Sequence, residues 1–586
     1  MSQKLAFILA LILAAFMLQT TTAGQTLPPA IQWIPQDAVI VLELSEPRAL
    51  LEVFTNDKAT AAVMALPLYK EQASKPQFKE FLNIINFVEV TLDTDWRTGL
   101  AKLTGGGITF AVCPEDTVLL IIDAEDEHML ERLHEFFLNI ARAEAEKKGQ
   151  SNQVASTEYD GVKAWTFNGE EAHAIIGKRL VFANRSEGLK AVLKLRAEAK
   201  GASLVSNTTY QAAKRAAGPD VIATVFTNLK PLMQLPKVAR LLEQQRNNPL
   251  AALSFAGIVE AVRDSNWLAL GLHVEDSKLV FRASVDGKTV APTSPAAFAL
   301  PNKSGEGVLP NVSVPRRIAA LSLYRDLHQF YAAKDDLFPD RTSGLIFFEN
   351  MMGIFFSGRD LTSEVLAETK PEIRIVVAEQ EYEPAMGTPQ IKLPAFAAIL
   401  RLRRPEQFNE VAEEAWQKAV GLINFTRGQQ ALPGLIIGRP IQGETQFTVA
   451  AFSTAEIEDK TKLDQRFNYR PALAMPGEYL ILSSTDGLAR DLIDALGRET
   501  EHTVKPLAQT HSLVEIDAAQ LASILEANRE TLVRSGMVKK GSTQEESETE
   551  IDMLITVVKF VDHVKLSIGT HEALTQARLE MKLNWE

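Results

Sequence analysis

The chain has 586 residues, of which 46% are hydrophobic and 23% are charged, and its formal net charge at pH 7 is −13. This length exceeds what one hydrophobic core supports, so we expect about two to four domains. The negative charge argues against nucleic acid or anionic lipid as the main partner, because binding phosphates requires a basic surface. A local basic patch at Arg401, Arg403 and Arg404 stays open as an alternative.

The N-terminus is typical of a secretory signal peptide. Lys4 supplies the positive charge, residues 5–18 form an apolar run, and the small residues 21–23 allow cleavage after Ala23. The run is shorter than the roughly 20 residues of a membrane span. We therefore assign residues 1–23 to a signal peptide and expect an exported protein, periplasmic or extracellular. Retention at the membrane by an uncleaved signal is the alternative, and no later stretch is apolar enough to span a bilayer.

Residues 27–288 are predicted to form a first unit of mixed strands and helices. The expected elements, in chain order, are a strand at 38–44, a helix from Pro47, an apolar helical stretch at 81–92, strands at 108–112 and 118–122, a helix carrying Met129, Leu133, Phe136, Phe137 and Ile140, strands between 162 and 183, and a hairpin of 268–274 with 279–285. The long helix is inferred from apolar residues three and four apart, which form one stripe. The only cysteine, Cys113, is interpreted as a small buried hydrophobe rather than a nucleophile, and no intramolecular disulfide can form.

The segment 289–314, rich in Pro, Ser, Gly and Asn, is predicted to be a linker. Residues 315–586 then repeat the order of elements: a strand at 318–323, a helix from about 326, an apolar stretch at 346–356, strands at 373–377 and 395–402, a helix carrying Phe408, Val411, Ala415, Ala419 and Leu422, and a hairpin of 564–568 with 577–583. Short motifs recur too, since 180–183 with 186–189 resembles 479–482 with 485–488. The sequence therefore predicts two tandem similar units.

The fold class that we predict is α+β, with a mainly antiparallel sheet covered by helices in each unit. Several consecutive strands have hairpin spacing, as between 162 and 183, which cannot hold a parallel crossover. We therefore favour antiparallel sheets with helices on one face. A doubly wound α/β fold is the alternative.

Motifs for catalysis are missing from the sequence. It contains no Gly-x-Ser-x-Gly elbow, His-Glu-x-x-His helix, Walker-type phosphate loop or Cys-x-x-Cys pair. The glycine triplet 105–107 lacks the spacing of a dinucleotide loop and is interpreted as a turn. His128 and His134 lie roughly 240° apart around one helix, so they cannot face one metal ion. We predict no catalytic residue, no cofactor-binding residue and no metal ligand.

Asp123, Glu125, Asp126 and Glu127 form the densest acidic cluster in a segment expected to be ordered. They could form a calcium site or a carboxylate pair, or they could simply be the acids that the first turn of a helix favours. The matching turn of the second unit, residues 401–406, carries three arginines. A site shared by both units is therefore excluded, whereas a site in the first unit alone stays open.

The recurring turns at 186–189 and 485–488 each place a hydroxyl, an acid and a glycine between a strand and a helix. Ser186 and Thr485 can cap the helix, and the acid suits its first turn. Because the pattern recurs in both units, we interpret it as structural.

These features resemble a family of exported bacterial proteins that is defined only as a domain of unknown function and is best known from planctomycetes. The motifs are the signal peptide, a Pro-x-Asp-Ala-x-x-x-x-Glu strand at 35–43, a Tyr-Asp-Gly-Val turn at 159–162 and Ser-Glu-Gly-Leu at 186–189. The resemblance covers most of residues 30–290. A weaker resemblance covers 309–586, which departs from the pattern at 316–317 and 442–443. It implies no activity, cofactor or catalytic residue.

Three functional hypotheses follow. The first is a non-catalytic exported binding, scaffolding or envelope-associated protein, with an envelope component or a small ligand in a cleft between the units as its partner. The second is an unrecognised hydrolase with a site in one unit only, near Asp123 or at Asp95 with Arg97. The third is a carrier of an apolar ligand, which requires an apolar cavity within a unit.

Overall fold

The computed structural model describes residues 27–55, 94–198, 202–238, 249–275, 278–287, 297–301, 303–338, 341–502, 504–572 and 574–584, with isolated residues between 60 and 89 and residue 240. The predicted signal peptide and almost all of the helical stretch predicted at 81–92 lie outside the described residues. The chain divides into two compact units, residues 1–235 with 265–286 and residues 236–264 with 287–584. The class is α+β, as the sequence predicts.

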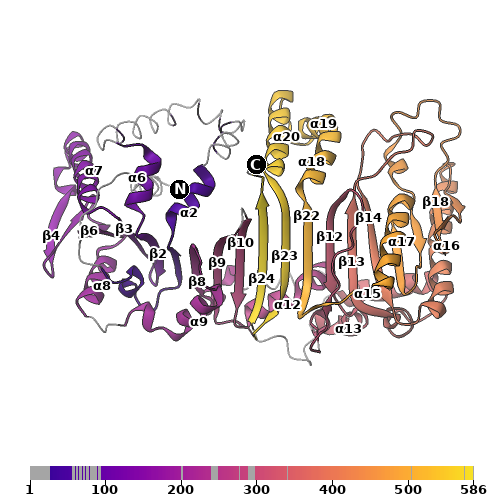
Figure 1. Ribbon diagram of the computed structural model, residues 1–586, viewed down its shortest axis with the longest axis horizontal. Helices are drawn as coiled ribbons and strands as arrows, with labels where there is room; N and C mark the ends of the chain where they lie inside the picture. Colours follow the sequence, from indigo (N-terminus) through magenta and orange to yellow (C-terminus); the bar gives the residue numbers. More distant parts are fainter. Residues whose placement is uncertain are drawn as a thin grey trace. The chain divides into compact units, whose positions relative to one another are not determined.

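The first unit contains one antiparallel sheet with the strand order β4-β5-β6-β7-β3-β2-β1-β8-β9-β10. Figure 1 labels most of these strands, whose bounds are β1 (Ile40–Leu44), β2 (Gly107–Cys113), β3 (Thr117–Asp123), β4 (Ala155–Tyr159), β5 (Val162–Thr166), β6 (Ala172–Ile176), β7 (Arg179–Ala183), β8 (Ala223–Asn228), β9 (Trp267–Glu275) and β10 (Lys278–Val285). The predicted hairpin spacing between 162 and 183 is confirmed, because β5, β6 and β7 pair in succession.

The sheet of the second unit has the order β15-β18-β19-β20-β14-β13-β12-β22-β23-β24, again antiparallel throughout. Its strands are β12 (Arg317–Tyr324), β13 (Thr369–Ala378), β14 (Ala395–Leu402), β15 (Ile436–Gly438), β18 (Thr448–Ala451), β19 (Ala472–Ala474), β20 (Tyr479–Ser483), β22 (Thr510–Asp517), β23 (Val561–His571) and β24 (Leu574–Leu583). Strand for strand, this order matches the order in the first unit. That the two units are copies of one another stays a prediction.

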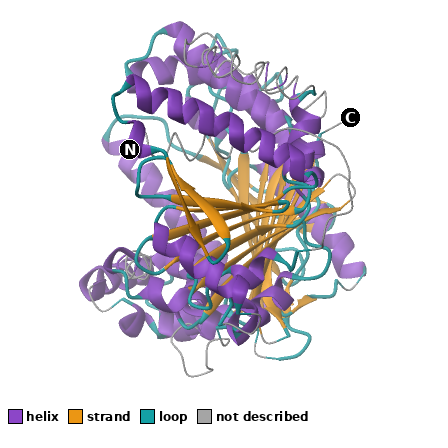
Figure 2. Cartoon of the chain, turned by 90° about the vertical axis from the view of Figure 1, so that its left-hand side faces the viewer, coloured by secondary structure: helices purple, strands orange, loops and turns teal. Residues whose placement is uncertain are grey.

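Helices cover both faces of the first sheet, not the one face that we expected. Four consecutive residues of β3, 119–122, are buried, so side chains that point to opposite faces are both shielded from water. Leu120 and Ile122 pack with α7 (Glu127–Lys147), whereas Leu119 lies against α8 (Ser186–Ala197). Figure 2 shows helices on both sides of the strands.

The second sheet is covered in the same way. Ile399 of β14 packs with α17 (Asp486–Glu501) in one core cluster, and Leu400 packs with α16 (Pro405–Gln429) in another. The further helices of this unit are α12 (Pro249–Arg263), α13 (Leu327–Ala332), α14 (Lys334–Leu337), α15 (Thr342–Phe355), α18 (Ala518–Ala527), α19 (Arg529–Lys540) and α20 (Gln544–Lys559). The first unit adds α2 (Pro47–Thr55), α6 (Trp96–Leu103), α9 (Thr208–Ala217) and α10 (Leu229–Met233).

Helix α12 belongs to the second unit, although the strands before and after it in the chain, β8 and β9, belong to the first. Arg325, which is 1% exposed, holds it there. The guanidinium donates to the carbonyls of Leu253 at 2.6 Å and Ser254 at 2.8 Å in α12, and to that of His511 at 2.9 Å in β22. The first unit that we predicted, 27–288, included this segment, because sequence order alone places it there.

Candidate functional site

The acidic cluster of the first unit is divided among separate structural contacts. Asp123 accepts two hydrogen bonds from Arg179, at 2.5 and 2.9 Å, and Arg179 is 1% exposed and stacks on Trp33 with 4.2 Å to the ring centroid. Glu125 pairs with Arg48. Each of these carboxylates therefore neutralises an arginine of its own unit.

The other two acids of the cluster sit at the start of α7, as the structural interpretation predicts. Asp126 is the N-cap and accepts from the backbone N–H of Met129 at 3.3 Å, and Glu127 lies in the first turn. Among the described residues, no group of three or more His, Cys, Asp or Glu side chains is arranged to hold a metal ion.

Asp95 and Arg97, the other pair considered for catalysis, also have a structural role. Asp95 caps α6 by accepting from the backbone N–H groups of Arg97 and Thr98, both at 3.0 Å. Hydrogen bonds from the Thr98 hydroxyl and the Thr98 backbone N–H favour the charged form and lower the pKa of Asp95. A carboxylate held as a helix cap is a poor proton acceptor for a substrate.

Two further candidates behave as buried or neutralised groups. Cys113 ends β2 and is buried, and burial raises the pKa of its thiol to about 12, which matches its interpretation as a small hydrophobe. Two of the three arginines considered as a basic patch are paired: Arg401 with Glu478 at 2.7 Å, and Arg404 with Glu368. The third, Arg403, donates to the backbone carbonyl of Thr369 at 3.1 Å. Acidic partners therefore offset most of the positive charge of the patch.

The recurring turns differ in detail between the units. Thr485 caps α17 by accepting from Leu488 N–H at 3.3 Å, as predicted, but Ser186 lies inside α8 and bonds Glu187 at 3.1 Å instead. A Cβ on Gly188 would lie 2.8 Å from Thr117 Cγ2, whereas a Cβ on Gly487 would have nothing within 4 Å. Close packing requires glycine in the first unit only.

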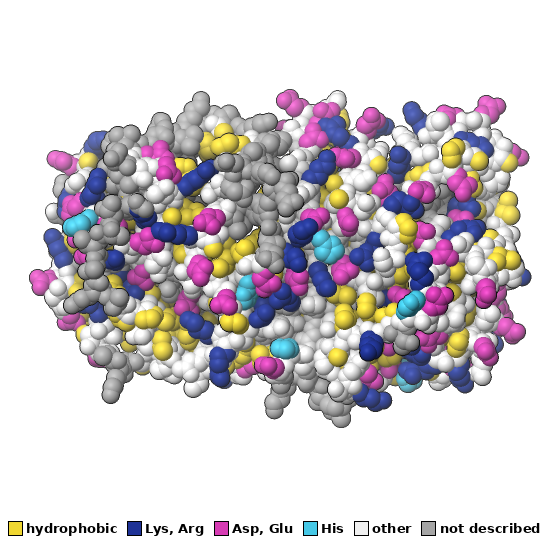
Figure 3. Space-filling model, in the orientation of Figure 1, with side chains coloured by type: hydrophobic (Ala, Val, Ile, Leu, Met, Phe, Trp, Pro, Cys, Tyr) yellow, Lys and Arg dark blue, Asp and Glu magenta, His cyan; other side chains and the backbone are white. Residues whose placement is uncertain are grey.

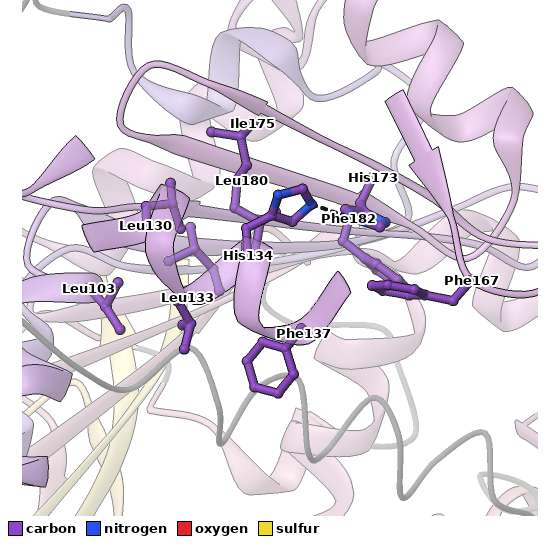
Figure 4. Close-up of a pocket in the computed structure, with 11 residues that line it drawn as sticks. Leu103, Leu130, Leu133, His134, Phe137, Phe167, His173, Ile175, Leu180 and Phe182 are labelled. Atoms are coloured by element: carbon purple, nitrogen blue, oxygen red, sulfur yellow. Dashed lines mark hydrogen bonds between the residues drawn. The ribbon is translucent and has the colours of Figure 1, made fainter. Parts of the chain in front are cut away.

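Two histidines that are distant in the sequence meet in the first unit. Nε2 of His134 on α7 lies 3.1 Å from Nε2 of His173 on β6, and the ring of Phe167 stacks on His173 at 4.7 Å (Figure 4). Burial lowers the pKa of His134 to about 4, and burial together with the charge of His134 lowers that of His173 to about 3. Both rings are therefore neutral at pH 7, with one N–H shared between them.

The pocket around this histidine pair is too small for an organic ligand. Its volume is about 30 Å³, and its walls are mainly Leu, Ile and Phe side chains from α6, α7, β3, β6 and β7. A space of this size holds no more than a water molecule or two. We therefore interpret the pair as a buried polar contact in the core.

The second unit contains a much larger apolar cavity under α16. Its volume is about 570 Å³, within the range of about 300–1,000 Å³ typical of small-molecule sites. The walls come from α13, α15, α16 and strands β14, β19 and β20, and include Phe348, Met352, Phe408, Ala415, Trp416, Leu473 and Leu480. Almost the whole lining is aliphatic or aromatic.

Tyr331 contributes to the wall of this cavity. The side chain is 6% exposed, and its hydroxyl is buried. Burial raises the pKa of the hydroxyl, and the charge of Glu349 and a hydrogen bond to it add to the shift, so the hydroxyl stays protonated. Lys334 lies 5.1 Å from the Tyr331 ring and pairs with Glu349 at 3.4 Å. The polar end of Tyr331 therefore lies beside charged residues of its own unit, and the cavity offers mainly apolar contacts.

The stripe on α16 was visible in the sequence, but the cavity was not. Phe408, Ala415 and Ala419 line it as the stripe predicts, whereas Leu422 at the far end of the stripe is 54% exposed. Small side chains at 412, 415 and 419 are a signal that the helix leaves space against the sheet. Small side chains can also let a helix pack closer to the sheet, which leaves no cavity. The alanines alone therefore could not predict one.

The chain was compared with known proteins. No protein-family model matches it, and no curated protein matches it. Two crystal structures of TP0453, crystal forms III and I, are similar to part of it, each with a TM-score of 0.21, at 10% and 11% identity. Both cover 47% of this chain, and 86% and 84% of TP0453 respectively. A similarity this low carries no argument about function.

Proposed function

We propose that this chain is a non-catalytic exported protein whose second unit binds an apolar ligand. The cavity of about 570 Å³ under α16 is the observation that carries the proposal. Transfer of apolar surface from water into such a cavity is favourable at about 25 cal/mol per Å².

The contacts of the acidic residues favour the carrier hypothesis over the hydrolase hypothesis. Asp123 is committed to Arg179, and Asp95 caps a helix. The cavity, by contrast, has a lining that suits burial of a chain of CH₂ groups, and no ionisable pair faces one another across it among the described lining residues. Export rests on the N-terminal sequence pattern.

Titration with an anthroyloxy-labelled long-chain fatty acid tests the proposal. The wild type should bind one probe per chain with a rise in fluorescence. The Ala415→Trp variant places an indole in the cavity and should weaken binding by about tenfold or more. Asn409→Trp, on the exposed side of the same helix, is the matched control and should bind as the wild type does.

Equal binding by wild type and Ala415→Trp would refute the proposed function. Thermal midpoints of all variants serve as a check that they fold.

A further inference from the structure

Helix α15 has two apolar faces, and only one of them is covered. Phe348, Met352, Phe355 and Phe356 line the cavity from one side of the helix and its end. On the opposite side Ile346, Phe347 and Ile354 are 52%, 71% and 70% exposed. A helix that is apolar all round is normally buried, so the outer face calls for an occupant.

The outer face carries no charge. Its other exposed residues are Ser343, Gly344 and Asn350. The one acid of the helix, Glu349, is turned to Lys334 of the same unit at 3.4 Å. By contrast, acidic and basic side chains are interspersed over the face of the molecule drawn in Figure 3. Such a stripe suits a partner with an apolar, uncharged interior directly beneath its surface, as a lipid bilayer has in its acyl chains.

The length of α15 decides how such a stripe meets a lipid bilayer. Its 14 residues give about 21 Å, less than the roughly 30 Å of a hydrocarbon core. Among the described residues, no helix is both long enough and apolar enough to cross a membrane. The helix can therefore lie in the interface, with its outer side chains among the acyl chains. Arg341, exposed at the N-cap, would then reach the phosphate level.

The inner face of the same helix links this surface to the cavity. Phe348 of α15 and Leu482 of β20 both line the cavity and are 38% and 43% exposed. The exposed stripe and one wall of the cavity are therefore two sides of the same helix.

We propose that the outer face of α15 docks on the surface of an electrically neutral lipid bilayer, and that the ligand of the cavity is an acyl-chain lipid taken from it. The inference rests on the proposed function for the identity of the cargo. The net charge of −13 disfavours anionic bilayers, which is why a zwitterionic surface is specified.

Flotation with phosphatidylcholine vesicles tests the docking surface. The full chain without its signal peptide should float with the vesicles. The double variant Phe347→Ser/Ile354→Ser should lose vesicle affinity by on the order of tenfold or more, because two large side chains no longer enter the acyl region. The matched control is Val538→Ser/Val557→Ser, which removes exposed apolar side chains from α19 and α20 (80% and 50% exposed) and should float as the wild type does.

Transfer of the labelled fatty acid separates docking from binding. The α15 double variant should take up probe from vesicles more slowly, while its affinity for probe in solution stays at the wild-type value. Ala415→Trp should float normally and take up no probe. Flotation of the α15 variant at the wild-type level, or equal loss in the control, overturns the docking proposal. Unchanged probe binding by Ala415→Trp overturns the proposed function and leaves the flotation result standing.

Discussion

The arginine that anchors α12 offers a sharp test of how the second unit is held together. Arg325 is 1% exposed, and its guanidinium bonds five backbone carbonyls and the Ser512 hydroxyl. Among the described residues no carboxylate accepts from it, and burial lowers its pKa to about 10. The change Arg325→Met keeps a long side chain and removes every donor.

The expected loss follows from the hydrogen bonds that the guanidinium donates. The three shortest, at 2.6, 2.7 and 2.8 Å, reach the carbonyls of Leu253, Tyr324 and Ser254. A hydrogen bond to a charged group contributes about 1.5–3 kcal/mol, so loss of these three costs about 4.5–9 kcal/mol. Removing the buried cation also removes its desolvation cost, which offsets several kcal/mol of that loss. We expect Arg325→Met to destabilise the second unit by about 3 kcal/mol.

Hydrogen–deuterium exchange of the α12 and β12 peptides is the assay, because a chain with two units need not unfold in one step. Exchange in these peptides should speed up by about a hundredfold, while β3 and β7 of the first unit keep their protection. The exposed Arg498→Met on α17 is the control and should change nothing. If Arg325→Met alters α12 exchange by less than about threefold, the carbonyls do not depend on the guanidinium and the reasoning fails.

Three further predictions concern the first unit and its matching turn. The pKa values of His134 and His173 are about 4 and 3, below the unfolded value of about 6.5. The stabilisation from these neutral rings should therefore be complete above pH 6.5 and fall as the pH drops toward 4. Thermal midpoints of a His134→Phe/His173→Phe variant should show a flatter pH dependence than those of the wild type. Gly188→Ala should destabilise by about 1–3 kcal/mol by overpacking, whereas Gly487→Ala, with open space around it, should be neutral or stabilising by up to about 1 kcal/mol in urea titrations. Cys113 should resist iodoacetamide at pH 8 in the native protein and react within minutes in urea, since its thiol is buried; rapid labelling of the native chain would contradict this.

The strands and long helices could be predicted because their apolar periodicity is strong. The hairpin spacing of β5, β6 and β7 appears in the structure, and so does most of each stripe on α7 and α16. The last residue of each predicted stripe is exposed, Ile140 by 42% and Leu422 by 54%. The side on which helices cover the sheet was predicted less well. Strand β3, with residues 119–122 buried, has apolar residues at 118–122 without alternation, which is the pattern of a strand covered on both faces.

Contacts between distant residues were beyond the sequence pattern. His134 meets His173, Asp123 meets Arg179, and α12 joins strands that follow it in the chain. None of these pairs has a characteristic spacing, since the topology of the sheet brings them together. The cavity likewise depends on how far α16 stands from β20, which side-chain size along one helix does not determine.

The placement of α12 has a consequence for the order in which the chain is made. Helix α12 is synthesised before β12 and β22, the strands to which Arg325 connects it. More than half of the chain is still to be made when α12 leaves the ribosome, so its apolar residues are exposed until those strands follow. During that interval β9 and β10 can already complete the first sheet. The strands of the first unit can thus pair before α12 has its partners, and a chaperone that binds α12 during synthesis would shield its apolar residues.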